Sequence, residues 1–190
     1  MKKVFLTTMF VIMATTAFSQ ITIKPGVRAG VNLSNITNTN FDDKTDFYIG
    51  VFAEFNFANF YALQPELNYT RQGADSKFPG ELDIEIQYIS LAVANKFSPF
   101  KGLGLHFIAG PAINIKVDDN LDNSFSSLEG FDILIFGGVG YNFPFDLSVE
   151  ARYNLGIIDI FGSNVNNSSP IDEVLLNKVI QIGATYKFDF

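Results

Sequence analysis

The sequence predicts an all-β protein: eight antiparallel strands that follow one another up and down and close into a barrel. Eight separate stretches alternate between apolar and polar residues, which is the two-residue period of a β-strand. The connections between them alternate between long polar segments and very short ones, as in a meander of hairpins. The last stretch is also among the most apolar, and closing the barrel leaves it no exposed edge.

The first half of the chain supplies four of these strands. In the third stretch Pro65 cannot donate a ladder hydrogen bond, so we expect a bulge or bend there. In the fourth, the isoleucines before Tyr88 lie on the opposite parity to the apolar residues after it. We therefore expect a bulge or a change of environment near Tyr88, with the first part lying beyond the apolar zone. The four expected strands are residues 23–34, 46–57, 60–71 and 82–97.

The second half supplies the other four strands. A short turn at 98–102 leads into the first of them, another at 144–146 joins the second to the third, and both turns contain proline. The four expected strands are residues 103–117, 130–143, 147–157 and 175–190. The long polar connections are predicted to gather at one end of the barrel, and they are residues 35–45, 73–81, 117–129 and 158–174.

Residues 1–19 read as a secretory signal peptide, which leaves residues 20–190 as the barrel domain. Lys2 and Lys3 precede a mostly apolar run, and Ala17, Phe18 and Ser19 form a small-x-small cleavage site. The run is shorter than the ~20 residues of a membrane-spanning helix. Without residues 1–19 the chain has 13 − 2 = 11 basic and 20 acidic residues, a net charge of −9. Nucleic acid is therefore a poor partner, and the absence of cysteine excludes disulfides and thiolate metal sites.

Three features favour a barrel that spans the outer membrane over a soluble, lipocalin-like ligand carrier. The apolar parity is almost free of charge through the middle of every strand, and the opposite parity is rich in glycine, which suits a crowded interior. Aromatic residues on the apolar parity also gather at the strand ends next to the short turns, where an interfacial girdle belongs. These aromatics are Phe55, Phe57, Phe60, Tyr61, Phe97, Tyr141, Phe143, Tyr186 and Phe188.

An even number of strands places both termini at the short-turn end, which is periplasmic if the long loops face outward. The expected partners are then outer-membrane lipid and lipopolysaccharide, with the barrel-assembly machinery acting during biogenesis. Tyr186, Phe188 and Phe190 resemble the terminal aromatic signal that this machinery recognises.

Charged residues on the inward parity are predicted to form a lumen charge network. Their four positive and three negative charges nearly balance, as buried ion pairs must. We expect this network to close the lumen, because an eight-stranded barrel is just wide enough for side chains. The alternative is a path for protons or a solute. The seven residues are Arg28, Glu54, Glu66, Lys96, Glu150, Arg152 and Lys187.

No catalytic, cofactor or metal site is predicted. His106 is the single histidine and lies on the inward parity, so we interpret it as a packed polar residue. The acidic stretch that begins at Asp118 has oxygen ligands but lacks the spacing of a calcium loop, and we interpret it as a solvated loop.

The chain resembles the PorT-like family of small outer-membrane β-barrel proteins of Bacteroidota, over essentially all of residues 20–190. The resemblance rests on the segments 27–34 (VRAGVNLS), 63–69 (LQPELNY), 150–156 (EARYNLG) and 186–190 (YKFDF). It implies an eight-stranded barrel and no single activity. The secretion role of particular members does not carry over, because no matching functional motif is present.

The sequence therefore predicts a non-enzymatic barrel with a closed polar lumen and a structural or surface-interaction role. One alternative is a recognition or adhesion barrel that binds a surface partner through the four long loops. A less favoured alternative is a lipid-modifying enzyme, which needs a nucleophile and base that this chain does not offer on its loops.

Overall fold

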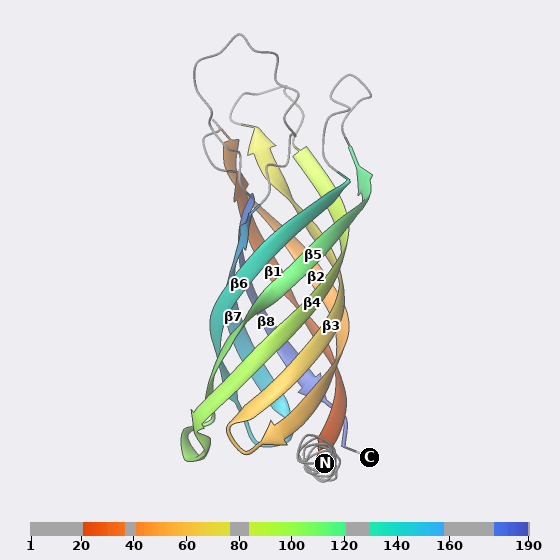
Figure 1. Cartoon of the computed structure of the whole chain (residues 1–190). Coiled ribbons are helices and arrows are strands. Elements are labelled where there is room, and N and C mark those ends of the chain that lie inside the picture. The colour runs from red at the N-terminus through yellow and green to blue at the C-terminus, as the bar shows by residue number, and fades with distance from the viewer. Residues whose placement is uncertain (1–20, 37–40, 77–83, 121–129, 158–176, 190) are drawn as a thin grey trace, which may run out of the picture.

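The computed structural model describes residues 21–36, 41–76, 84–120, 130–157 and 177–189, and confirms the predicted fold. Eight antiparallel strands pair in sequence order, and β1 pairs with β8 to close the barrel (Figure 1). A short 3-10 helix, Lys101–Leu103, joins β4 to β5. The strands are β1 Thr22–Ile36, β2 Phe41–Ala58, β3 Tyr61–Ser76, β4 Ile84–Phe100, β5 Leu105–Asp119, β6 Phe131–Asn142, β7 Leu147–Gly156 and β8 Asn177–Lys187.

The pairing register sets the tilt of the strands. A walk around the barrel along paired residues starts at Thr22 and returns to β1 at Asn32, ten residues further on. With about 3.3 Å per residue and about 4.8 Å between strands, this stagger gives a tilt of about 41°, within the ~35–45° of closed barrels. The residues on the walk are Thr22, Asn56, Ala62, Lys96, Ile108, Gly138, Arg152, Gln181 and Asn32.

The two ends of the barrel differ (Figure 1). At one end, called here the short-turn end, β2–β3, β4–β5 and β6–β7 are joined by short connections, β1 begins and β8 ends. The β6–β7 turn has two consecutive non-glycine residues with positive φ, Phe145 at 63° and Asp146 at 57°. At the opposite end, called the loop end, the four remaining connections lie outside the described residues.

Large apolar side chains cover the outside of the barrel, and the expected aromatic girdle surrounds its short-turn end. Neighbouring rings of the girdle contact one another in pairs. The centroid distances are 6.1 Å for Phe57 and Tyr61, 5.8 Å for Phe60 and Phe97, 4.9 Å for Tyr141 and Phe143, and 5.3 Å for Tyr186 and Phe188. An exposed apolar surface of this extent requires lipid around it.

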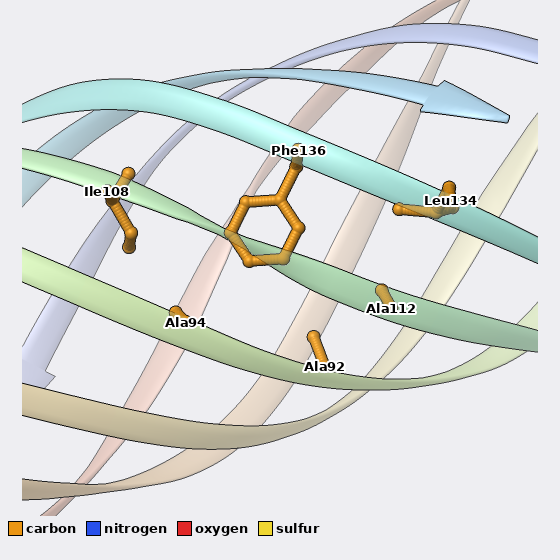
Figure 2. Packing of buried hydrophobic residues seen from close by; sticks show 6 residues of the cluster. All are labelled: Ala92, Ala94, Ile108, Ala112, Leu134 and Phe136. Carbon is orange, nitrogen blue, oxygen red and sulfur yellow. The ribbon is translucent and has the colours of Figure 1, made fainter. Parts of the chain in front are cut away.

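The interior is polar over most of its wall but has one apolar sector, on β4, β5 and β6. Figure 2 shows the Phe136 ring projecting from β6 over β5, beside Leu134 and the small side chains of the neighbouring strands. Small residues on β4 and β5 leave the space that the Phe136 ring fills. The sector consists of Ala92, Ala94, Ile108, Ala112, Leu134 and Phe136.

Several boundaries differ from expectation. The ladders continue past the apolar band at the loop end, so that β1 reaches Ile36, β2 begins at Phe41 and β3 reaches Ser76. The expected loops 35–45 and 73–81 are correspondingly shorter, because backbone pairing needs no apolar side chains. Most of 117–129 and all of 158–174 lie outside the described residues.

Of the two expected irregularities, one is absent and the other is present on the neighbouring strand. The bulge at Pro65 is absent: the register of β3 against β2 is the same on both sides of it, and Pro65 pairs in unbroken register with Val93 of β4. A register shift does occur at Tyr88, but the extra residue is on β5, where Gln87 and Tyr88 pair with Asp118 and Lys116. The inward parity of β4 therefore continues unchanged across Tyr88, and Ile86 is buried inside the barrel.

Within the described part of the chain no helix is long and apolar enough to cross a membrane.

Candidate functional site

The candidate site is a continuous set of ion pairs inside the barrel. The seven charged residues expected on the inward parity all point into the lumen, and they contact one another in a single series. Cations and carboxylates alternate along it, beginning in the middle of the lumen and ending at the short-turn end. The order is Arg28, Glu66, Arg152, Glu150, Lys96, Glu54 and Lys187.

Glu66 anchors the deepest part of the series. Arg152 donates to both of its oxygens, at 2.9 Å from Nη1 and 2.8 Å from Nη2, and Gln64 Nε2 donates at 2.8 Å. Arg28 Nη1 also pairs with Glu66, and its guanidinium lies 4.8 Å from the centre of the Tyr48 ring. The Glu66 side chain is 0% exposed, so these donors replace all of its hydration.

Glu150 connects this deep part to the lysines. Arg152 donates to Oε2 from Nη2 at 2.7 Å and from Nε at 3.1 Å, while Lys96 Nζ lies 3.2 Å from Oε1. His106 Nε2 is 3.3 Å from the same Oε1, and its side chain is fully buried. His106 is therefore held by the network and has no access to lipid or to solvent.

Glu54 and Lys187 end the series at the mouth. Glu54 Oε2 lies 3.1 Å from Lys96 Nζ, and Oε1 lies 3.1 Å from Lys187 Nζ. The Lys187 side chain retains 15% exposure, the highest in the series. A cavity of about 410 Å³ opens here, and all three residues line it.

The strand period and the barrel stagger together build this arrangement. Glu150 and Arg152 lie two apart on β7, so both point inward. β3 and β7 are four strands apart in a ring of eight, and the Arg152 side chain crosses the lumen to reach Glu66. Gly140 makes room, since a Cβ there would meet Glu150 Cγ at 2.9 Å and collide with the His106 ring.

Above the ion pairs, toward the loop end, the interior is polar and mostly uncharged, with Asp132 as a buried carboxylate. Asn32 Nδ2 donates to Thr70 Oγ1 and to the Arg71 carbonyl, both at 2.7 Å, and Asn32 Oδ1 accepts from Gln181 at 3.0 Å. A cavity of about 20 Å³ lies in this layer and touches Arg28. These amides were not among the predicted lumen residues, although their inward parity was the available signal.

A second charged cluster lies on the rim of the loop end. Arg71 pairs with Glu85 at 2.5 Å and with Asp46 at 3.4 Å, and its guanidinium lies 5.5 Å from the centre of the Phe47 ring. Phe47 in turn contacts Tyr69, with ring centroids 6.1 Å apart. This rim was not predicted, because Asp46 and Glu85 lie near the ends of expected strands, where charged residues are ordinary.

The remaining candidate residues have simpler placements. Tyr186 and Phe188 lie on the outer surface at the end of β8, and Phe190 is outside the described residues. Asp118 and Asp119 are the last residues of β5, and Asp119 Oδ2 lies 2.7 Å from Lys116 Nζ. Among the described residues, no group of three or more histidines or carboxylates is arranged to hold a metal ion. The expected signal peptide, residues 1–19, lies outside them.

Comparison with known proteins agrees with this architecture. A family model described as outer membrane protein beta-barrel domain matches residues 18–162. Among solved structures, Neisserial surface protein A has a TM-score of 0.53 at 12% identity, with 90% of this chain and 100% of that chain covered. Ail, the attachment invasion locus protein of Yersinia pestis, has a TM-score of 0.50 at 12% identity, with 87% and 98% covered. A search of curated proteins found no match. At these identities the structural likeness establishes the fold alone.

Proposed function

Because the chain belongs to the outer membrane protein beta-barrel domain family, it is an outer-membrane β-barrel protein, and we propose that its ion-pair network keeps the lumen closed. The proposed role is structural or surface-interacting, without catalysis. The observation that carries the closed lumen is the series from Arg28 to Lys187, in which the six residues deeper than Lys187 have side chains at most 6% exposed. The series separates the 410 Å³ cavity at the short-turn end from the 20 Å³ cavity above it.

Both electrostatic and steric effects support a closed lumen. An ion in transit must displace a carboxylate or a cation from a partner with which it is buried, and breaking such a pair costs ~3–5 kcal/mol. An eight-stranded interior holds side chains and leaves no continuous water channel.

Single-channel recording in planar bilayers tests this proposal. The native protein is expected to give no stable conductance steps, whereas the double variant Glu150→Ala, Arg152→Ala opens the middle of the series and is expected to give steps. Regular steps from the native protein, at the same frequency as from the double variant, would overturn the proposed closure.

We further propose a family subgroup, a processing site and an orientation in the membrane. The chain is a PorT-like member of its family, residues 1–19 are a cleaved signal peptide, and both termini are periplasmic, so that the loop end faces outward. The girdle at the short-turn end supports the placement of that end at a membrane interface. Protease digestion of intact cells tests the orientation: an epitope inserted between residues 158 and 176 should be cleaved, and one at the carboxy terminus should be protected.

The absence of catalysis is supported by the position of His106. Its ring is buried against Glu150, and lipid modification requires a base within reach of a lipid headgroup. Lipid mass spectrometry of a deletion strain tests this, and no change in lipid composition is expected.

Surface recognition through the four connections at the loop end, which the sequence places within 35–45, 73–81, 117–129 and 158–174, is a second proposal. One solved structure similar in fold is Ail in complex with the heparin analogue sucrose octasulfate, at a TM-score of 0.51 and 14% identity. The net charge of −9 for residues 20–190 disfavours a polyanionic ligand of that kind for this chain. Deleting each loop and measuring binding to host-cell or matrix surfaces distinguishes recognition from a purely structural role.

A further inference from the structure

The cavity at the short-turn end has the size of a ligand site. Its volume of about 410 Å³ lies within the ~300–1,000 Å³ of small-molecule pockets. Charged residues line its inner part, and neutral polar side chains from the strand ends line its sides. The charged residues are Glu54, Lys96 and Lys187, and the neutral ones include Asn56, Ser98 and Asn142.

The ion-pair series that ends at this cavity has one more cation than carboxylates. Deeper in the lumen, Arg28 and Arg152 are matched by Glu66 and Glu150. At the mouth, Lys96 is shared between Glu150 and Glu54, and Lys187 pairs with the other oxygen of Glu54. The most exposed cation of the series, Lys187, therefore lies where the series meets the cavity.

Other charges at this end do not cancel that excess from within the cavity. Lys24 pairs with Asp146 and with Asp189, each at 3.2 Å. Lys24 lines an adjoining cavity of about 690 Å³ that also includes Glu54 and Lys187, whereas the two aspartates line neither cavity. Among the described residues Lys187 Nζ makes one ion pair, and it has three N–H donors, so it can bind an additional acceptor.

We propose that this cavity binds a small ligand with a single anionic group, such as a carboxylate, and that Lys187 and Lys96 provide the positive charge that holds it. The ligand enters from the short-turn end and stops at the ion-pair series. The inference rests on the closed lumen proposed above, because the series forms the inner wall of the site. A free organic acid and the carboxy terminus of a peptide present the same chemistry.

Nuclear magnetic resonance of the protein in phospholipid nanodiscs tests the site. Sodium acetate is titrated against sodium chloride at constant ionic strength, and the peptide Ala-Ala-Ala is compared with its carboxy-terminal amide. Saturable shifts are expected for the backbone amides of Asn56, Ser98 and Gly102, with none at Lys116 near the loop end. Saturation by acetate identifies a free acid as sufficient, and saturation by the peptide alone identifies a chain terminus.

Substitutions give the sign of the effect. Lys187→Gln removes the excess charge and is expected to weaken binding at least about tenfold, or ~1.4 kcal/mol, whereas Lys187→Arg keeps the charge and retains binding. Glu54→Gln raises the net positive charge at the cavity and is expected to tighten acetate binding. Lys116→Gln is the matched control, because Lys116 pairs with Asp119 away from the cavity. Non-saturable shifts, or equal affinity in Lys187→Gln and the native protein, overturn the site.

Single-channel recording of the same variants in planar bilayers separates the proposed ligand site from the proposed closed lumen. A closed Lys187→Gln barrel that has lost acetate binding supports both. A closed native barrel that never binds either probe overturns the ligand site and leaves the closed lumen intact.

Discussion

Arg152 on β7 and Glu66 on β3 form a two-bond ion pair across the full width of the lumen, at 2.9 and 2.8 Å. The two strands lie on opposite sides of the barrel, so the pair connects walls that share no ladder hydrogen bonds. Because both side chains are buried, each depends on the other for the interactions that water provides elsewhere.

Replacing Glu66 with glutamine should destabilise the barrel by ~3–5 kcal/mol, because Arg152 loses a charged partner and Arg28 loses the one to which it is paired. Urea unfolding in phospholipid vesicles, followed by heat-modifiable migration on gels, measures the change. Glu54→Gln is the control at the mouth, where Lys187 still reaches water, and it should cost less. Equal losses for the two variants would contradict the importance of burial.

Residue parity was enough to predict the seven charges of the ion-pair series, but the prediction missed the buried carboxylate of Asp132 and did not show which charges pair. Glu150 and Arg152 are two residues apart in the sequence and contact each other, whereas Arg152 and Glu66 are 86 apart. The second contact depends on the stagger of all eight strands, and a single sequence gives no register between distant strands. The apolar sector around Phe136 was equally hidden, because Leu134 and Phe136 interrupt the polar parity for only two positions.

Gly140→Ala should destabilise the barrel by ~1–3 kcal/mol, since the added methyl group overpacks the interior against the His106 ring and Glu150. Gly137→Ala is a matched control three residues away on the same strand, and a Cβ there meets nothing within 4 Å. Urea unfolding of the two variants provides the comparison. A loss in Gly137→Ala as large as that in Gly140→Ala would indicate a backbone effect rather than crowding.

Asn114→Leu should be neutral or stabilise the barrel by ~1 kcal/mol. The side chain is 1% exposed, and neither its Nδ2 nor its Oδ1 has a hydrogen-bond partner in the described part of the chain. Removing an unsatisfied buried amide removes its desolvation cost. Asn32→Leu is the matched control, because Asn32 is equally buried and bonds to Thr70 and Gln181. The Asn32→Leu variant should lose several hydrogen bonds and be clearly destabilised. A similar loss of stability in Asn114→Leu would contradict the prediction.

Phe145→Asn should stabilise the barrel by about 1 kcal/mol. Phe145 has φ of 63° in the β6–β7 turn, a backbone region that asparagine tolerates better than other non-glycine residues. Phe145→Ala is the control, because it removes the exposed ring without favouring positive φ. Chemical unfolding in vesicles should rank asparagine above alanine. Equal stabilities would show that the turn stores no strain at this position.

The loop end was the part least predictable from the sequence. Polar residues such as Asp42 and Asp75 pair across β2 and β3, in stretches expected to be loop. Backbone hydrogen bonding extends these ladders beyond the apolar band, and hydrophobic periodicity cannot report it. At the short-turn end the aromatic girdle was predicted correctly, because there the apolar pattern and the strand boundaries coincide.

Removing Phe188–Phe190 should reduce insertion into the outer membrane while the surface loops keep their properties. Phe188 donates its backbone N–H to the Pro25 carbonyl at 2.8 Å and its ring contacts Tyr186 at 5.3 Å, so the change removes a contact at the β1–β8 closure as well as the proposed assembly signal. Fractionation of cells, with heat-modifiable migration of the membrane fraction, measures assembled protein. Phe188→Ala isolates the ring from the backbone, and Phe145→Ala controls for the loss of an exposed aromatic at the same end. Assembly of the truncated protein at the native level would show that β8 needs no terminal aromatic.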